Sequence, residues 1–238
     1  MSARVPEPER RIVLAVASRL LQYPDDEFPG QLPLLRDAVR GIAPAVGQPL
    51  LRCIERLARS PLLELQADYV ATFDLRRRNC LYLTYHLNGD TRRRGTALWR
   101  LRQVYRDHGY SVAAGELPDF LPALLELAAE TGAEEPLDLL LEHQAAIGVL
   151  GDALEEARSP YADVIAALQA ALPPPSRAVR EEIRQLEAEG PPAELVGIER
   201  PDLPVAVEPT AEGFTARAPV PGAAAGARLP GAAPGIRS

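Results

Sequence analysis

The feature that most constrains this chain is a helical apolar period that recurs from about residue 9 to about residue 189. Within each segment apolar residues repeat three and four positions apart, and Pro or Gly separates one segment from the next. No segment shows a convincing pair of alternating strands. The sequence therefore predicts an all-α fold, a single bundle-like domain of helices.

The segments have definite expected limits. Helices are expected over residues 9–22, 31–42, 48–59, 61–73, 80–87, 91–108, 117–131, 134–158, 161–172 and 176–190. Ser60, Asp90 and Ser176 are the expected N-caps, because their side-chain oxygens accept a hydrogen bond from the first turn of a helix. The apolar 80–87 segment is compatible with a strand or a buried helix, and helix is predicted because no neighbouring segment supplies a second strand.

The composition changes at residue 190. Residues 190–238 contain nine Pro and seven Gly in 49 positions, and Phe214 is their only aromatic residue. Such a segment buries too little apolar surface to offset its chain entropy. The prediction is a helical domain over residues 1–189 and a disordered tail over residues 190–238.

Charge is unevenly distributed along the chain. The formal net charge of −7 argues against general nucleic-acid affinity. Residues 76–106 hold nine Arg and a single acid, whereas residues 116–156 hold eleven acids and no Lys or Arg. Two interpretations of the Arg cluster stay open: a solvated face paired with the acidic stretch, or contact with an anionic ligand or an acidic partner. The anion-binding candidates are Arg92, Arg93 and Arg94.

No motif for catalysis or metal binding is complete. The sequence GDTRRRGT at 89–96 has five residues between its glycines, where a phosphate loop has four, and Thr96 where that loop has Lys. The three histidines, His86, His108 and His143, lack the spacing of metal ligands. We therefore expect a binding protein with no catalytic residue, no metal and no cofactor.

Two further patterns concern location and partners. The apolar runs are too short to span a membrane and the N-terminus does not resemble a signal peptide, so a soluble cytoplasmic protein without membrane insertion is expected. The acidic, Leu-rich stretch 116–142 is expected to form one wall of a groove for a basic amphipathic peptide. Trp99 falls opposite the apolar stripe of its helix, and we expect it to pack beneath another segment rather than face a partner.

Three blocks of sequence resemble a known family. They are SRLLQYPDD (18–26), DYVATFDLRRRNCLYLTYHLNGDTRRRG (68–95) and GELPDFLPALLELA (115–128), which occur in the family's order and cover about 110 residues with their intervals. The chain resembles the delta subunit, or assembly chaperone, of respiratory nitrate reductase, within the wider family of molybdoenzyme chaperones. The middle block is long and specific.

The resemblance implies an all-helical, non-enzymatic chaperone of the cytoplasm. Such a protein binds the N-terminal segment of the catalytic (alpha) nitrate reductase subunit, keeps that apoprotein open for insertion of molybdenum cofactor, and prevents premature membrane docking. Transient contact with the molybdenum cofactor machinery is a further expectation. Many relatives in the wider family carry His after the Pro-Asp pair; Phe120 stands here instead, so no role of that His is carried over.

The implied peptide groove combines apolar and acidic side chains. The residues implied by the resemblance are Tyr69, Phe73, Leu81, Tyr82, Pro118, Asp119 and Phe120. Leu121 is expected to join the apolar contacts, and the acids Glu116, Asp119 and Glu126 are expected to select basic flanks of the peptide and speed the encounter. The alternative function is a cofactor- or nucleotide-binding protein that uses the Arg76–Arg94 cluster, and a third is a helical scaffold subunit kept in a complex.

Overall fold

The prediction of an all-α fold is confirmed. The computed structural model describes residues 5–89, 91–113 and 115–190, and in these ranges the chain forms eleven α-helices and no strand. A π-helical turn, η1, and a 3-10 turn, η2, lie in the middle of the chain. The predicted disordered tail, 190–238, lies outside the described residues apart from Gly190, and the proposed domain limits stay a prediction.

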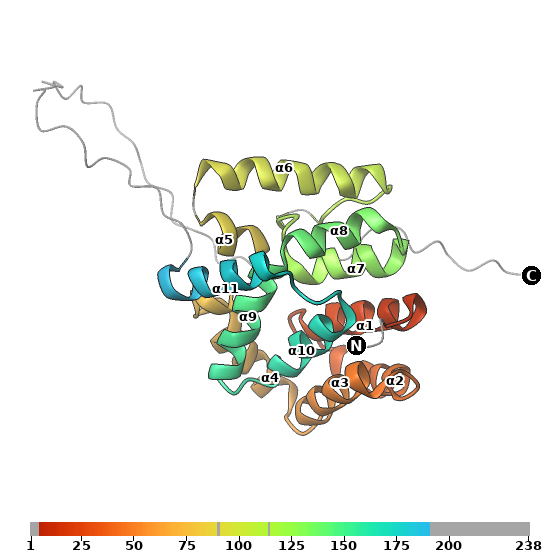
Figure 1. Ribbon diagram of the computed structural model, residues 1–238. Helices are drawn as coiled ribbons and strands as arrows, with labels where there is room; N and C mark the ends of the chain where they lie inside the picture. The colour runs from red at the N-terminus through yellow and green to blue at the C-terminus, as the bar shows by residue number, and fades with distance from the viewer. Residues whose placement is uncertain (1–4, 90, 114, 191–238) are drawn as a thin grey trace, which may run out of the picture.

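Figure 1 shows the order of these elements in space. Along the chain they are α1 (Glu7–Leu20), α2 (Phe28–Arg40), α3 (Pro44–Leu57), α4 (Leu62–Tyr69), η1 (Val70–Asp74), η2 (Arg77–Asn79), α5 (Leu83–Asn88), α6 (Arg92–Asp107), α7 (Leu121–Thr131), α8 (Glu134–Glu142), α9 (Gln144–Glu156), α10 (Ala162–Ala171) and α11 (Arg177–Glu189). The predicted helix over 80–87 is shortened at its start, because α5 begins only at Leu83.

Proline positions several of the helix starts. α3 begins at Pro44 rather than after Gly47, because a proline in the first turn lacks only an N–H that would have no partner inside the helix. The predicted Ser60 cap is wrong: Pro61 is the N-cap residue of α4, and no side chain caps that helix. The Ser176 cap is confirmed, since its Oγ accepts a hydrogen bond from the backbone N of Val179 at 3.2 Å. Asp90 lies outside the described residues.

The expected single helix over 134–158 is wrong, because the chain turns at His143, where φ is −101° and ψ is 16°. The two helices that replace it pack against different neighbours: α8 packs on α6 and α7, whereas α9 packs on α5, α10 and α11. One straight helix cannot reach both sets. The corner is held by the His143 Nδ1, which donates to the carbonyl of Leu139 at 2.7 Å, and by the Gln144 amide, which donates to the carbonyl of Pro173 at 2.6 Å.

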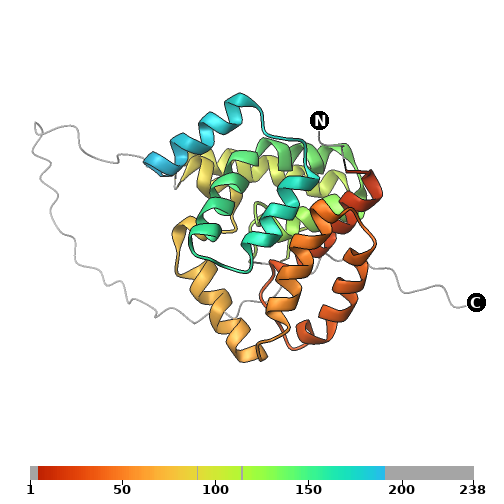
Figure 2. The same cartoon turned by 60° about the horizontal axis from the view of Figure 1, so that its bottom comes forward.

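The core is built around α1 and α7, which lie along each other. Leu14, Leu20 and Leu124 are among the side chains that fill their contact region, each at most 2% exposed. Ser18, buried in α1, donates from Oγ to the carbonyl of Pro122 in α7 at 2.8 Å. In the turned view of Figure 2, α3 lies beside α2 and α10 and closes the other end of the bundle. The described helices other than α11 thus share one hydrophobic core.

Candidate peptide-binding site

Two predicted site segments, distant in sequence, meet in a short backbone pairing. Tyr82 and Phe120 form an isolated antiparallel bridge. On either side of it, the N–H of Leu83 donates to the carbonyl of Asp119 at 3.0 Å and the N–H of Leu121 donates to the carbonyl of Leu81 at 2.8 Å. The starts of α5 and α7 are therefore fixed against each other, which no periodicity in the sequence indicated.

Asp119 is the polar centre of this junction and is fully buried. Its Oδ2 accepts hydrogen bonds from the backbone N of Thr84 at 3.1 Å and from the Thr84 hydroxyl at 2.5 Å. The Arg94 guanidinium lies 3.8 Å from the same oxygen. Buried charges are tolerated when they are paired and hydrogen-bonded, and Asp119 meets both conditions through Oδ2, whereas its Oδ1 is buried without a hydrogen-bond partner. In this conformation its carboxylate joins three elements and does not face solvent.

The rim of the junction is more accessible. The phenol of Tyr82 donates to Glu116 Oε1 at 2.8 Å, and the ring of Tyr82 lies beside that of Phe120 with centroids 5.5 Å apart. Burial, and then the hydrogen bond to Glu116, raises the pKa of the Tyr82 hydroxyl well above its usual value. Tyr82, Glu116 and Phe120 are each half-buried. They form an aromatic and acidic edge that is partly open to solvent.

The other predicted apolar contacts lie in the core. Tyr69 and Phe73 are 5% and 6% exposed, and the Tyr69 hydroxyl donates to the carbonyl of Leu21 at 2.9 Å. The Phe73 ring packs on Tyr161 with centroids 4.8 Å apart. Leu81, Pro118 and Leu121 are likewise buried. Their contact with a peptide stays a prediction, and it requires these side chains to be uncovered first.

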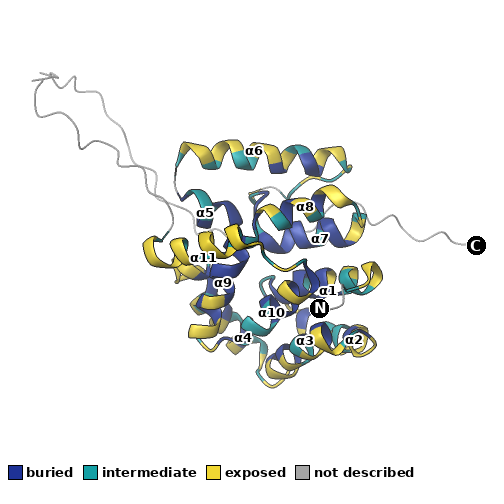
Figure 3. Cartoon of the chain, viewed as in Figure 1, coloured by how far each residue is buried: buried dark blue, intermediate teal, exposed yellow. Residues whose placement is uncertain are grey.

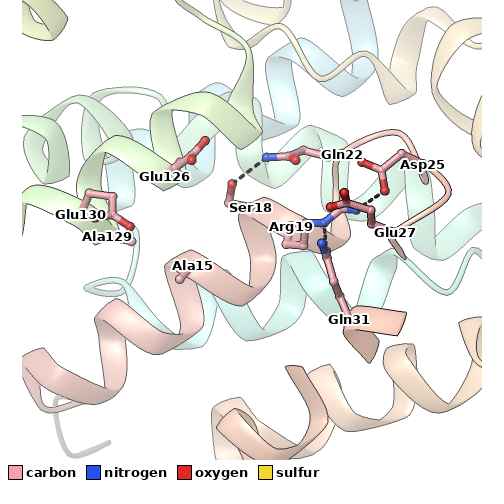
Figure 4. Close-up of a pocket in the computed structure, with 10 residues that line it drawn as sticks. All are labelled: Ala15, Ser18, Arg19, Gln22, Asp25, Glu27, Gln31, Glu126, Ala129 and Glu130. Carbon is pink, nitrogen blue, oxygen red and sulfur yellow. Dashed lines mark hydrogen bonds and ion pairs between the residues drawn. The ribbon is translucent and has the colours of Figure 1, made fainter. Parts of the chain in front are cut away.

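Glu126 lies in a pocket of about 360 Å³ between α1, the loop after α1 and α7 (Figure 4). Its lining residues are Ala15, Ser18, Arg19, Gln22, Asp25, Glu27, Gln31, Glu126, Ala129 and Glu130. Only Glu126 was among the predicted site residues. Most of the α1 side belongs to the first sequence block that resembles the family, but helical periodicity marks only the opposite, apolar face of that block.

The pocket carries an excess of negative charge. Arg19, the only cation among its described lining residues, donates to Gln31 Oε1 at 2.5 Å and to Asp25 Oδ1 at 2.7 Å, so its charge is directed to the α2 side. On the α7 side, burial and then the carboxylate of Glu130 raise the pKa of Glu126. Glu126 Oε2 is buried without a hydrogen-bond partner. A basic side chain entering the pocket would stabilise the ionised form of Glu126 and would supply a hydrogen-bond donor to its Oε2.

Within the described residues, contacts between the Arg cluster and the acidic stretch include three pairs. Arg100 makes a bidentate pair with Glu142, with both N–O distances at 2.7 Å. Arg78 lies 3.7 Å from Glu156, and Arg94 pairs with Asp119 as described. These contacts favour the interpretation of a paired face. Arg92 and Arg93 lie exposed at the start of α6, and anion binding by Arg92, Arg93 and Arg94 stays a prediction.

Trp99 is 62% exposed, so the expectation that it packs beneath another segment is wrong. α6 lies along one edge of the bundle (top of Figure 1) and buries only Leu101, Val104 and Tyr105. The indole is on the opposite side of that helix, which none of the described elements crosses. The sequence pattern placed Trp99 on the correct face but could not tell whether that face was covered.

The histidines and thiols have structural surroundings. Each of the three imidazoles hydrogen-bonds a backbone carbonyl within 3.0 Å: His86 that of Cys80, His108 that of Val104 and His143 that of Leu139. Burial raises the pKa of both cysteine thiols, Cys53 and Cys80. Within the described residues no group of three or more His, Cys, Asp or Glu is placed to hold a metal ion. In the same residues no helix is long and apolar enough to cross a membrane.

Comparisons with known proteins agree with one another. A family model described as nitrate reductase delta subunit matches residues 35–167. The probable nitrate reductase molybdenum cofactor assembly chaperone NarJ of Bacillus subtilis is 33% identical over 165 residues, 69% of this chain and 90% of that protein. The chaperone NarJ of Escherichia coli K12 is 30% identical over 154 residues, 63% of this chain and 65% of that protein.

A third relative is longer. The nitrate reductase-like protein NarX of Mycobacterium tuberculosis H37Rv is 40% identical over 157 residues, which is 66% of this chain. The matched part is 24% of that relative, so this chain corresponds to about a quarter of its length.

Proposed function

The chain belongs to the nitrate reductase delta subunit family, and from this premise we propose that it is an assembly chaperone for a respiratory nitrate reductase. It binds the N-terminal segment of the catalytic (alpha) subunit in the cytoplasm and supports insertion of molybdenum cofactor into that subunit. The relatives named NarJ are molybdenum cofactor assembly chaperones and not catalytic subunits, which confirms the prediction that the chain is not an enzyme.

One observation carries the peptide-binding part of the proposal. α7 and the loop before it contribute both the accessible aromatic and acidic edge at Phe120 and the acidic pocket at Glu126. A basic amphipathic segment needs both, an apolar surface for its hydrophobic side chains and carboxylates for its Lys or Arg. Burying apolar surface contributes about 25 cal/mol per Å² before the costs of association. The carboxylates add selectivity for basic flanks and speed the encounter.

The experiment is a calorimetric titration of the full chain with a peptide that copies about the first 15 residues of the catalytic subunit. Saturable binding that weakens as salt rises is expected, because exposed charge pairs are screened. Phe120→Ala and Glu126→Gln should each weaken binding by about tenfold, the loss of one good contact. Glu134→Gln, an exposed change at the start of α8, is the matched control and should leave affinity unchanged.

Three outcomes would overturn this assignment of the site. They are binding that is undiminished by both variants, binding equally reduced by the α8 control, and no heat of binding at several temperatures. Transient contact with the molybdenum cofactor machinery is part of the same proposal, and it is tested by whether cofactor-loading proteins are retained with the chain only when the client subunit is present.

A second candidate function is favoured by one observation. A pocket of about 440 Å³ is lined by Arg76, Arg77, Arg78 and Asn79 on one side and by Ala153, Glu156 and Ala157 of α9 on the other. Three Arg against a single acid suit a phosphate-bearing ligand such as a guanine dinucleotide. Equilibrium dialysis of the isolated chain against that dinucleotide tests it: tight, salt-sensitive binding lost in Arg77→Ala supports this function, and absence of binding removes it.

A further inference from the structure

α11 is held to the bundle differently from the other long helices. None of its 13 residues is buried, and in Figure 3 it lies mostly exposed across α9, which is largely buried. Its half-buried apolar residues, Val179, Ile183 and Leu186, follow one another four and three positions apart and form a single stripe. The family model ends at residue 167, so α11 lies beyond the matched part of the chain.

α11 and the connection that leads into it contact a row of three α9 residues four positions apart: Gln144, Gly148 and Asp152. At the centre, a Cβ on residue 148 would lie 2.5 Å from Cδ1 and 2.9 Å from Cγ1 of Ile183. The absent side chain of Gly148 therefore creates a notch that Ile183 fills. At one end, Gln144 holds the carbonyl of Pro173, the connection that leads into α11.

The other end of the row opposes two like charges. Asp152 of α9 meets Glu187 of α11, and burial, followed by the hydrogen bond and the charge of Glu187, raises the pKa of Asp152. Two ionised carboxylates at this contact repel each other, and a base at position 187 would attract Asp152 instead. The notch thus fits α11 in shape, while the charge beside it favours a different occupant.

We propose that α11 is a displaceable strap over a helix-binding groove on α9, and that the groove accepts a basic amphipathic helix from a partner protein. In the partner helix, a branched apolar residue fills the Gly148 notch and a Lys or Arg four positions later pairs with Asp152. Charge complementarity selects this partner over α11 itself. The groove goes beyond the proposed function, because none of the residues argued for the α7 site lines it.

The test uses a probe taken from the chain: a synthetic peptide of residues 176–189 with Lys in place of Glu187. It is titrated into the full chain, the Ile183→Asp variant, whose strap is released, and the Glu187→Lys variant, whose strap is tightened. The release should strengthen probe binding by about tenfold, because the free groove no longer requires displacement of α11. The Glu187→Lys variant should bind more weakly than the unchanged chain. Glu182→Lys carries the same charge change on an exposed position and is the matched control.

Two further measurements secure the assignment of the groove. Adding Gly148→Leu to the Ile183→Asp chain fills the notch and should abolish probe binding, while circular dichroism shows that the bundle is still folded. A probe that retains Glu187 should bind about fivefold more weakly than the Lys probe. The proposal is overturned if the strap-released chain binds no more tightly than the unchanged chain, or if binding ignores both the filled notch and the charge at position 187. Neither result depends on the nitrate reductase peptide.

Discussion

α7 and α11 are both apolar-striped helices of similar length, yet one is part of the core and the other lies on top of it. Eight of the 11 residues of α7 are buried, against none of the 13 in α11. α7 is covered by α1 and α8 and is fixed at its start by the Tyr82–Phe120 bridge, whereas α11 packs on α9. The comparison teaches that an apolar stripe indicates a packing partner, while the number of covered faces decides how permanent that packing is.

The largest expected effect breaks the attachment of α7 at its start. Asp119→Ala removes the acceptor of both Thr84 hydrogen bonds and leaves Arg94 beside an empty, buried site. Losing one member of a buried pair costs about 3 to 5 kcal/mol. Urea denaturation at pH 7, followed by circular dichroism, measures the change in the free energy of unfolding. Asp138→Ala, an exposed acid on α8, is the control; a loss below about 1 kcal/mol for Asp119→Ala would contradict the central role of this carboxylate.

A matched pair of truncations sharpens the comparison between the helices themselves. Leu124→Ala in α7 removes a fully buried side chain and should lower the free energy of unfolding by about 3 kcal/mol. Leu186→Ala in α11 removes a half-buried one and should cost less than about 1 kcal/mol. The same urea titrations give both values. Equal losses would show that α11 is as much a part of the core as α7.

The smallest expected effect is a pH-dependent change in stability caused by Glu126 of α7. The pKa of Glu126 is raised in the folded chain, so its ionised form destabilises the fold above that pKa, and this penalty disappears as pH falls below the ordinary value of 4.5. Glu126→Gln should therefore raise the free energy of unfolding at pH 7, by less than about 1 kcal/mol because the side chain is partly exposed. At pH 4 the two proteins should be nearly equal. A variant that is less stable at pH 7 would disprove the unfavourable burial of this carboxylate.

Local cap signals predicted one helix start and missed another, because Ser60 does not cap α4, whose N-cap residue is Pro61. Ser176 caps α11 because a serine hydroxyl and a neighbouring N–H decide that geometry by themselves. The break at His143 was missed because it depends on which neighbours α8 and α9 meet, and those contacts are long-range. The exposed Trp99 was missed for the same reason: a helical pattern assigns a face but does not say what covers it.

The candidate site shows the same division between local and long-range information. Glu116, Phe120 and Glu126 were predicted and are at least partly accessible. Asp119 was predicted from the family resemblance and for its charge, but its carboxylate is buried in a junction that forms only when α5 reaches α7. The α1 side of the acidic pocket needed the three-dimensional structure, because Ser18 and Gln22 lie more than 100 positions from Glu126.

The bridge between Tyr82 and Phe120 has a topological consequence. Between Tyr82 and Phe120 the polypeptide builds α5 and α6 and returns to the same point 38 positions later, so the two ends of this excursion are held together by the bridge. The backbone anchors lie at the starts of α5 and α7, and the Arg94–Asp119 ion pair ties the first turn of α6 to the same junction. A protease cut inside the excursion would leave two fragments that still hold each other through the bridge and the core. A change in the length of the excursion beyond Gly95 would therefore leave the bridge and its two flanking hydrogen bonds in place.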